Sequence, residues 1–75
     1  MKIVYEEYSK DRNAKFIICE AENYYLIKVE RYYDEVDIEG YIEPAGFREV
    51  RDGMIHHVGT IEEGIPVGRE LLKNL

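Results

Sequence analysis

The chain has 75 residues, of which 45% are hydrophobic, and sixteen acidic against ten basic side chains give it a net charge of −6. This length predicts one small domain spanning residues 1–75, and the hydrophobic content argues against intrinsic disorder. The negative charge repels phosphate backbones, so we expect no direct binding of nucleic acid.

Cys19 is the only cysteine, so no disulfide within the chain can reinforce the core. A core of this size supplies only about 3–5 kcal/mol of stability, which makes self-association one route to further stability. No apolar run approaches the roughly 18 residues of a membrane span, and the N-terminal segment turns acidic too early for a signal peptide. We therefore expect a soluble, cytoplasmic protein with no membrane segment.

Three strands are predicted in the first half of the chain. Residues 2–8 alternate loosely, and residues 9–13 form a polar connector of good turn formers. Residues 15–21 are apolar on both faces, which is typical of a central strand. The pair Glu22-Asn23 then predicts a tight turn into a third strand over residues 24–33.

Residues 36–43 show the cleanest alternation of apolar and polar side chains in the chain. The pattern predicts one half-buried strand with Val36, Ile38 and Ile42 facing inward and Gly40 marking a bulge or bend. Residues 47–51 and 54–58 flank Asp52-Gly53, a strong hairpin signal, and are predicted to pair with each other.

The C-terminal segment predicts one short helix over residues 67–75, since its leucines recur at helical spacing. Thr60 and Glu63 have the spacing of a capping box, but Gly64 and Pro66 follow too soon for a long helix. The predicted fold is mainly β with minor α. It is an antiparallel meander of about six strands, partly closed into a small barrel, with a short C-terminal helix.

The residues best suited to catalysis or metal binding form no recognisable constellation. Adjacent residues of a strand point to opposite faces, so His56 and His57 cannot easily share one ion, and we expect one inward and one outward ring. Cys19 lies in an apolar run and is predicted to be an inert buried thiol. We therefore predict no catalytic residue, no cofactor and no metal site.

An acidic, tyrosine-rich segment follows the third predicted strand. Tyrosine is enriched in binding interfaces because it offers a large area at low entropic cost, although it is also a good strand residue. The carboxylates have two interpretations, a binding face or a solvated face that keeps the protein soluble. The predicted protein-binding residues are Tyr32, Tyr33, Asp34, Asp37, Glu39, Tyr41 and Glu43.

These observations predict a small, non-enzymatic interaction or regulatory module that binds a basic surface on a partner protein. Such a module can act as an inhibitor that places carboxylates where the phosphates of a nucleic acid would lie. One alternative is a structural or assembly subunit acting as a homo-oligomer. A third hypothesis, favoured by fewer features, is a small metal-binding or catalytic protein that uses His56 or His57.

Overall fold

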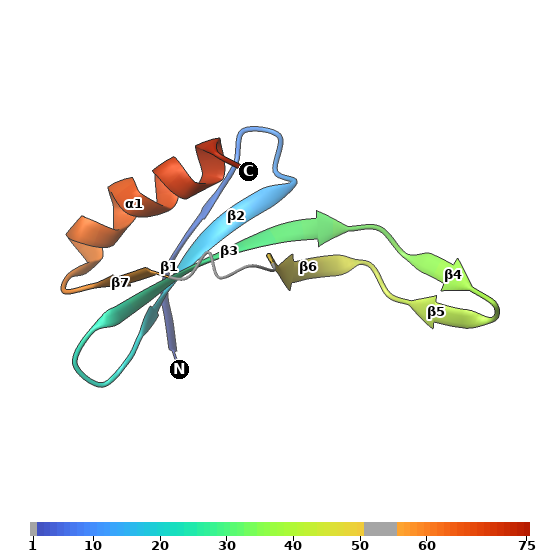
Figure 1. Cartoon of the computed structure of the whole chain (residues 1–75), viewed down its shortest axis with the longest axis horizontal. Helices are drawn as coiled ribbons and strands as arrows, with labels where there is room; N and C mark the ends of the chain where they lie inside the picture. Colours follow the sequence, from blue (N-terminus) through green and yellow to red (C-terminus); the bar gives the residue numbers. More distant parts are fainter. Residues whose placement is uncertain (1, 51–55) are drawn as a thin grey trace.

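A computed structural model of the chain describes residues 2–50 and 56–75 (Figure 1). The elements in these ranges are β1 (Lys2–Tyr8), β2 (Ala14–Glu20), β3 (Tyr25–Tyr33), β4 (Val36–Ile38), β5 (Tyr41–Glu43), β6 (Gly46–Glu49), β7 (His56–Val58) and α1 (Ile61–Lys73). The strands pair antiparallel throughout, which confirms the predicted class of mainly β structure with one C-terminal helix.

The main sheet has five strands, because β6 and β7 both pair with the same edge of β3. Its order is β1-β2-β3, after which β6 pairs with residues 30–33 and β7 with residues 25–27 of β3. The prediction that residues 47–51 and 54–58 pair as a hairpin is therefore wrong. The described strands of these segments, β6 and β7, lie one after the other along β3 instead of facing each other. The proposed turn, Asp52-Gly53, lies outside the described residues.

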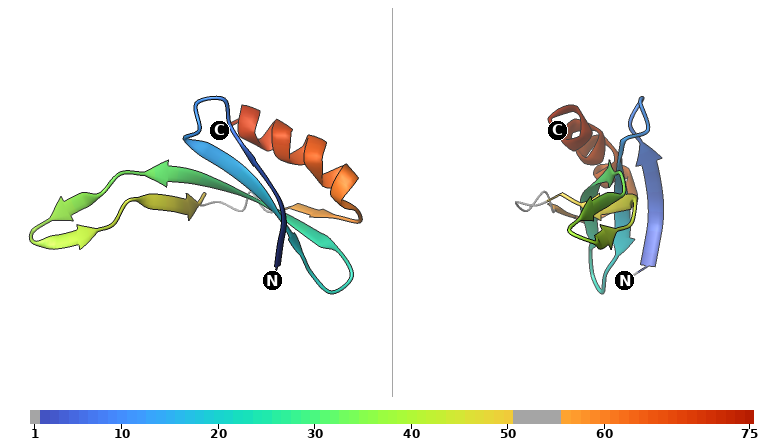
Figure 2. Two further views of the ribbon diagram at one scale, coloured as in Figure 1. Left: turned by 180° about the vertical axis from the view of Figure 1, so that it is seen from behind. Right: turned by 90° about the vertical axis from the view of Figure 1, so that its right-hand side faces the viewer.

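The predicted barrel is also wrong, because the sheet stays open (Figure 2). Among the described strands, β1 pairs only with β2, and β6 and β7 pair only with β3. Figure 2 shows α1 lying along one face of the sheet. A helix on one face buries apolar side chains against an open sheet, so this small core does not require closure.

The core lies between α1 and the central strands. Phe16, Ile18, Ile27 and Val29 are fully buried there. The alternate residues of β2 and β3 face the other side, where a smaller cluster forms around Ile17, Cys19 and Leu26. β2 is thus apolar on both faces, as predicted for a central strand.

α1 is longer than predicted and begins six residues earlier, at Ile61. The Thr60 side chain accepts a hydrogen bond from the Glu63 amide at 3.1 Å and so caps the helix. Pro66 lies on the exposed side of the helix, and as a proline it cannot donate a hydrogen bond to the carbonyl one turn earlier. Gly64 and Gly68 are buried, and a side chain at Gly68 would collide with the ring of Phe16. Gly64, which argued against a long helix, and Gly68 are positions where α1 packs closely on the sheet.

β4 and β5 form a separate two-stranded sheet that projects away from the main sheet and α1 (Figures 1 and 2). We call residues 34–45 the arm and the rest of the described chain the body. The arm contributes to the elongated shape of the molecule, which measures 45 × 27 × 20 Å along its principal axes.

Candidate functional site

The arm turns back on itself at Glu39-Gly40. Both residues have positive φ, 52° for Glu39 and 85° for Gly40, which is the signature of a type I′ hairpin turn. The Asp37 carboxylate accepts a hydrogen bond from the Gly40 amide at 3.1 Å and braces this turn. The prediction of one continuous strand over residues 36–43 is therefore wrong, because Gly40 marks a reversal of the chain and not a bulge.

This reversal changes which side chains share a face. Ile38 pairs with Tyr41 and Val36 with Glu43, so these four lie on one face of the arm. Ile42 pairs with Asp37 and lies on the other face. The predicted inward set of Val36, Ile38 and Ile42 is wrong on two counts, because Ile42 faces the opposite way and none of the three is buried.

The arm exposes large apolar side chains. The exposed fraction is 44% for Val36, 59% for Ile38, 70% for Tyr41 and 57% for Ile42. Exposed apolar residues that occur singly are normal on protein surfaces, but a contiguous group is typical of a binding site. An isolated two-stranded hairpin is also only marginally stable in water. The arm is thus a projecting, unburied apolar element.

Most of the net negative charge of the protein lies on this same element. The arm contains five acidic residues and no basic residue, which leaves eleven acidic and ten basic residues in the rest of the chain. The arm therefore carries a charge of −5, and the rest of the chain carries −1. This segregation combines apolar area and carboxylates on one narrow structure.

Among the described ion pairs, only one involves the arm, and it lies at the root. Arg48 of β6 binds the Glu43 carboxylate at 3.0 Å and donates to the Pro44 carbonyl at 3.0 Å. Its guanidinium also lies 5.4 Å from the centre of the Tyr33 ring. Within the described residues, Asp34, Glu35 and Glu39 form no ion pair, so their charges face solvent.

The structure places the predicted binding residues along one projecting segment but not on one face. Tyr33 and Asp34 lie at the root, and Tyr41 and Glu43 share one face of the arm. Asp37 lies on the opposite face, and Glu39 is in the turn.

Tyr32 lies at the border of the body. Its ring packs edge-on against Phe47, with 5.5 Å between centroids, and Phe47 in turn contacts Tyr8 at 5.7 Å. The Lys15 ammonium lies over Phe47 at 4.7 Å and binds Glu6 at 2.9 Å. This hydrogen bond to Glu6 raises the pKa of Lys15. The aromatic cluster is thus a neutralised part of the sheet surface, and its lysine is not free to attract a nucleic-acid phosphate.

Sequence reasoning missed the exposure of Val36, Ile38 and Ile42. The signal that could have revealed it is the pair Glu39-Gly40, flanked by apolar residues at the centre of the segment. Glutamate is less common than asparagine or aspartate at the first position of a type I′ turn, which weakens that signal.

Among the described residues, the two histidines and the cysteine do not come together in a catalytic or metal-binding site. His56 pairs with Ile27 and His57 with Leu26, so the rings lie on opposite faces as predicted, but both residues are exposed. The prediction of an inward ring is therefore wrong. His57 instead packs against Tyr24, with 5.0 Å between ring centroids. Cys19 is buried, and the part of the chain that the structure describes contains no group of three or more side chains able to hold a metal ion.

No helix among the described residues has the length and apolar composition required to cross a membrane. Comparison with known proteins also finds no match. No protein-family model, no curated protein and no solved structure is significantly similar to the chain. Any function assigned to this protein therefore rests on its own residues and their arrangement.

Proposed function

We propose that this chain is a non-enzymatic protein-interaction module whose arm binds a basic surface on another protein. One observation carries the proposal. A projecting hairpin combines a charge of −5 with four large apolar side chains that are 44–70% exposed. Neither property stabilises an isolated hairpin in water, and both become favourable when the arm is bound.

The apolar side chains favour insertion into a groove. Val36, Ile38 and Tyr41 lie on one face and Ile42 on the other, so a flat partner surface covers only part of them. A groove contacts both faces, and burial contributes roughly 25 cal/mol for each Å² of apolar surface removed from water. The tyrosine offers a rigid aromatic anchor of the kind found at interaction hot spots.

The carboxylates favour a basic partner. Attraction between opposite charges speeds association and makes it sensitive to salt, whereas two negative arms repel each other. Carboxylates spaced along a narrow hairpin also suit a site that normally holds a nucleic-acid backbone. Inhibition by mimicry of a nucleic acid is therefore one form of this proposal, in which the chain itself binds no nucleic acid.

One further observation favours the alternative of a homo-oligomeric assembly subunit. β1 leaves its outer edge without a partner strand among the described residues, and Ile3 on this strand is 54% exposed. Pairing of two β1 edges joins two sheets without bringing the arms together. Sedimentation at low micromolar concentration distinguishes the two hypotheses. The assembly-subunit hypothesis requires a dimer, whereas the arm proposal does not.

The test of the arm proposal is a comparison of charge variants in capture from a lysate of the source cells at low salt. The arm variant combines Glu35→Lys with Glu39→Lys, and the matched control combines Glu22→Lys with Glu62→Lys, which are exposed carboxylates of the body. Asp37 is left intact because it braces the turn.

We expect one protein to bind the wild-type chain and the control, to elute as salt is raised, and to bind the arm variant at least about tenfold less. A second variant, Ile38→Ser with Tyr41→Ser, removes apolar contacts without changing charge and should also lose this protein. If the arm variants retain the protein as well as the control does, the proposal is wrong.

A further inference from the structure

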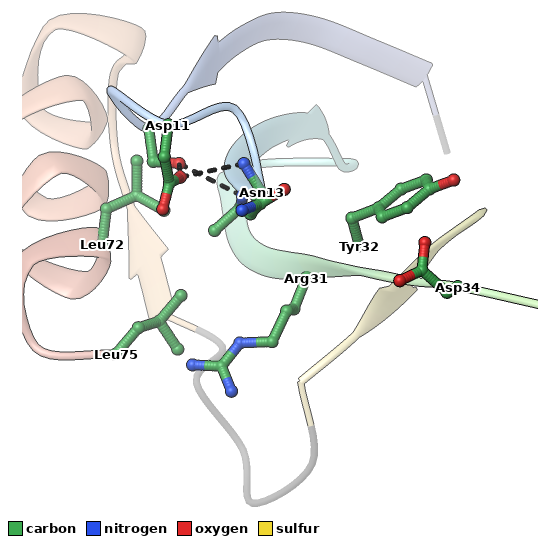
Figure 3. A pocket seen from close by; sticks show the side chains of 9 residues that line it. Asp11, Asn13, Arg31, Tyr32, Asp34, Leu72 and Leu75 are labelled. Atoms are coloured by element: carbon green, nitrogen blue, oxygen red, sulfur yellow. Dashed lines mark hydrogen bonds between the residues drawn. The ribbon is translucent and has the colours of Figure 1, made fainter. Parts of the chain in front are cut away.

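A cavity of about 480 Å³ opens at the end of the body, where three elements meet (Figure 3). The connector between β1 and β2 contributes Asp11 and Asn13, and the end of β3 with its following residue contributes Arg31 and Asp34. The last part of the chain contributes Leu72 and Leu75. The volume lies within the range of about 300–1,000 Å³ that is typical of small-molecule sites.

The connector that forms one wall is held by a compact set of hydrogen bonds. One oxygen of Asp11 accepts from the Asn13 amide at 2.9 Å and from the Ser9 hydroxyl at 2.7 Å. These bonds, the Asn13 amide first and the Ser9 hydroxyl second, lower the pKa of Asp11. The Asn13 carbonyl also accepts from the Tyr32 amide at 2.7 Å, which ties the wall to β3. Asp11 is therefore a fixed, ionised acceptor.

Arg31 supplies a cation on another side of the cavity. It lies opposite Ala14 on β2 and opposite Arg48 on β6, and like charges on directly opposite strand positions disfavour each other. Arg48 is neutralised by Glu43, whereas Arg31 forms no ion pair with any residue of the described ranges. Figure 3 shows its guanidinium reaching toward Leu75. The small side chain of Ala14 leaves room beside it.

The distribution of charge selects the kind of ligand. A simple anion can bind Arg31 but meets the carboxylates of Asp11 and Asp34, and a simple cation meets the guanidinium. A zwitterion can place its carboxylate on Arg31 and its ammonium on Asp11, while its aliphatic side chain covers Leu72 and Leu75. Figure 3 shows Asp34 on the other side of Arg31, where its carboxylate adds to the negative charge of the lining. A guanidinium fork suits a carboxylate in particular, because it can donate two parallel hydrogen bonds.

We propose that this cavity binds a free α-amino acid with an aliphatic side chain. The proposal is independent of protein binding by the arm, since Val36, Ile38 and Tyr41 do not line the cavity. Asp34 lies both in the arm and in the lining of the cavity, so its variants test this proposal only by their binding of small molecules.

The test is a nuclear magnetic resonance titration of the full chain with three matched probes: L-leucine, 4-methylpentanoate, which lacks the ammonium, and 3-methylbutylamine, which lacks the carboxylate. We expect L-leucine to shift the signals of Ala14, Leu72 and Leu75 with a Kd on the order of 1 mM. The other two probes should bind at least about fivefold more weakly. Absence of saturable shifts with L-leucine up to about 50 mM overturns the proposal, as does equal binding of all three probes.

Two variants assign the roles of the charges. Arg31→Gln should weaken L-leucine at least about tenfold, while the core signals of Ile18 and Ile27 stay in place. Asp34→Asn removes one carboxylate of the lining at an exposed position. It should therefore weaken the binding of L-leucine, which carries an ammonium group, and strengthen the binding of 4-methylpentanoate, which does not. Glu22→Gln is the control and should change the affinity for neither probe. If Asp34→Asn changes the affinity for L-leucine and for 4-methylpentanoate in the same direction, the assignment of a zwitterionic ligand is wrong.

Discussion

Ile27 and Ile38 are both isoleucines in strands, yet Ile27 is fully buried while 59% of Ile38 is exposed. Ile27 lies in the body, where α1 covers the central strands, and Ile38 lies in the arm, where none of the described elements covers it. Burial of the first stabilises the fold. Burial of the second requires another molecule or another copy of this chain.

Charge separates the two regions in the same way. The arm has five acidic residues and no basic residue, whereas the rest of the chain is nearly balanced, with eleven acidic and ten basic residues. Carboxylates of the body form ion pairs with Lys15, Lys28 and Arg69, while on the arm only Glu43 does so among the described residues. We interpret the body as the scaffold and the arm as the surface available for binding.

The largest expected contrast comes from shortening these two isoleucines. Ile27→Ala should lower the free energy of unfolding by about 3–5 kcal/mol, which is comparable to the whole stability of so small a domain. Ile27→Val should cost about 1 kcal/mol and keep the chain folded. Ile38→Ala should cost less than about 0.5 kcal/mol. Urea denaturation checks all three, and equal losses at the two positions would contradict the division into body and arm.

The contact between α1 and the sheet gives the next largest effect. Alanine usually stabilises a helix by about 1 kcal/mol relative to glycine. At Gly68, however, the added methyl group meets the ring of Phe16, which is fully buried and cannot move aside. Gly68→Ala should therefore destabilise the fold by about 2 kcal/mol in thermal or urea unfolding. Glu70→Ala, an exposed change in the same helix, is the control, and a stabilised Gly68→Ala protein would refute the close packing.

A smaller, pH-dependent effect is expected at Glu7, which joins β1 to α1. Its carboxylate accepts from Arg69 at 2.9 and 3.0 Å and from the Tyr5 hydroxyl at 2.7 Å. The Arg69 bonds first, then the Tyr5 bond, lower the pKa of Glu7 below its ordinary value of 4.5. The stabilisation is therefore present above the ordinary pKa and is lost as pH falls through the lowered one.

Glu7→Gln should lower Tm by no more than a few degrees near neutral pH, because the Arg69 side chain is 61% exposed and solvent screens the pair. The difference from the wild type should shrink as the pH is lowered through the pKa of Glu7. Thermal unfolding followed by circular dichroism across this range measures it. A difference that stays constant with pH would show that the ion pair is not its cause.

Removal of the whole arm should also have only a small effect on stability. Tyr33 and Gly46 pair directly, so Asn-Gly can replace residues 34–45 as a two-residue type I′ turn. We expect the free energy of unfolding to change by less than about 1 kcal/mol, because the arm adds little to the core. A shortened chain that fails to fold would mean that the arm belongs to the scaffold.

The body could largely be predicted because its signals are local. The strands at residues 2–8, 15–21 and 24–33 match β1, β2 and β3 to within one residue at each end. Apolar residues on both faces of β2 also indicated its central place. The pairing of β6 and β7 with β3 could not be predicted in this way, because it depends on the length of β3 and not on the segments themselves.

The errors in the arm and the helix have a common physical cause. Gly40 was interpreted as a bend within a strand, and Gly64 as a helix breaker, from local propensity alone. In the structure Gly40 supplies the positive φ of a turn, and Gly64 lets the helix approach Ile18 closely. For the candidate site, the sequence indicated the acidic and tyrosine residues, but it did not reveal that Val36, Ile38 and Ile42 are exposed beside them.

The most direct measurement of the central claim is photocrosslinking from two positions of the intact chain. A photoreactive phenylalanine analogue is placed at position 41, in the arm, or at position 62, on the exposed side of α1. The analogue at position 41 should crosslink one partner protein, with a yield that falls as salt is raised, and the analogue at position 62 should give little of that product. Crosslinking of the partner from position 62 but not from position 41 would contradict the account.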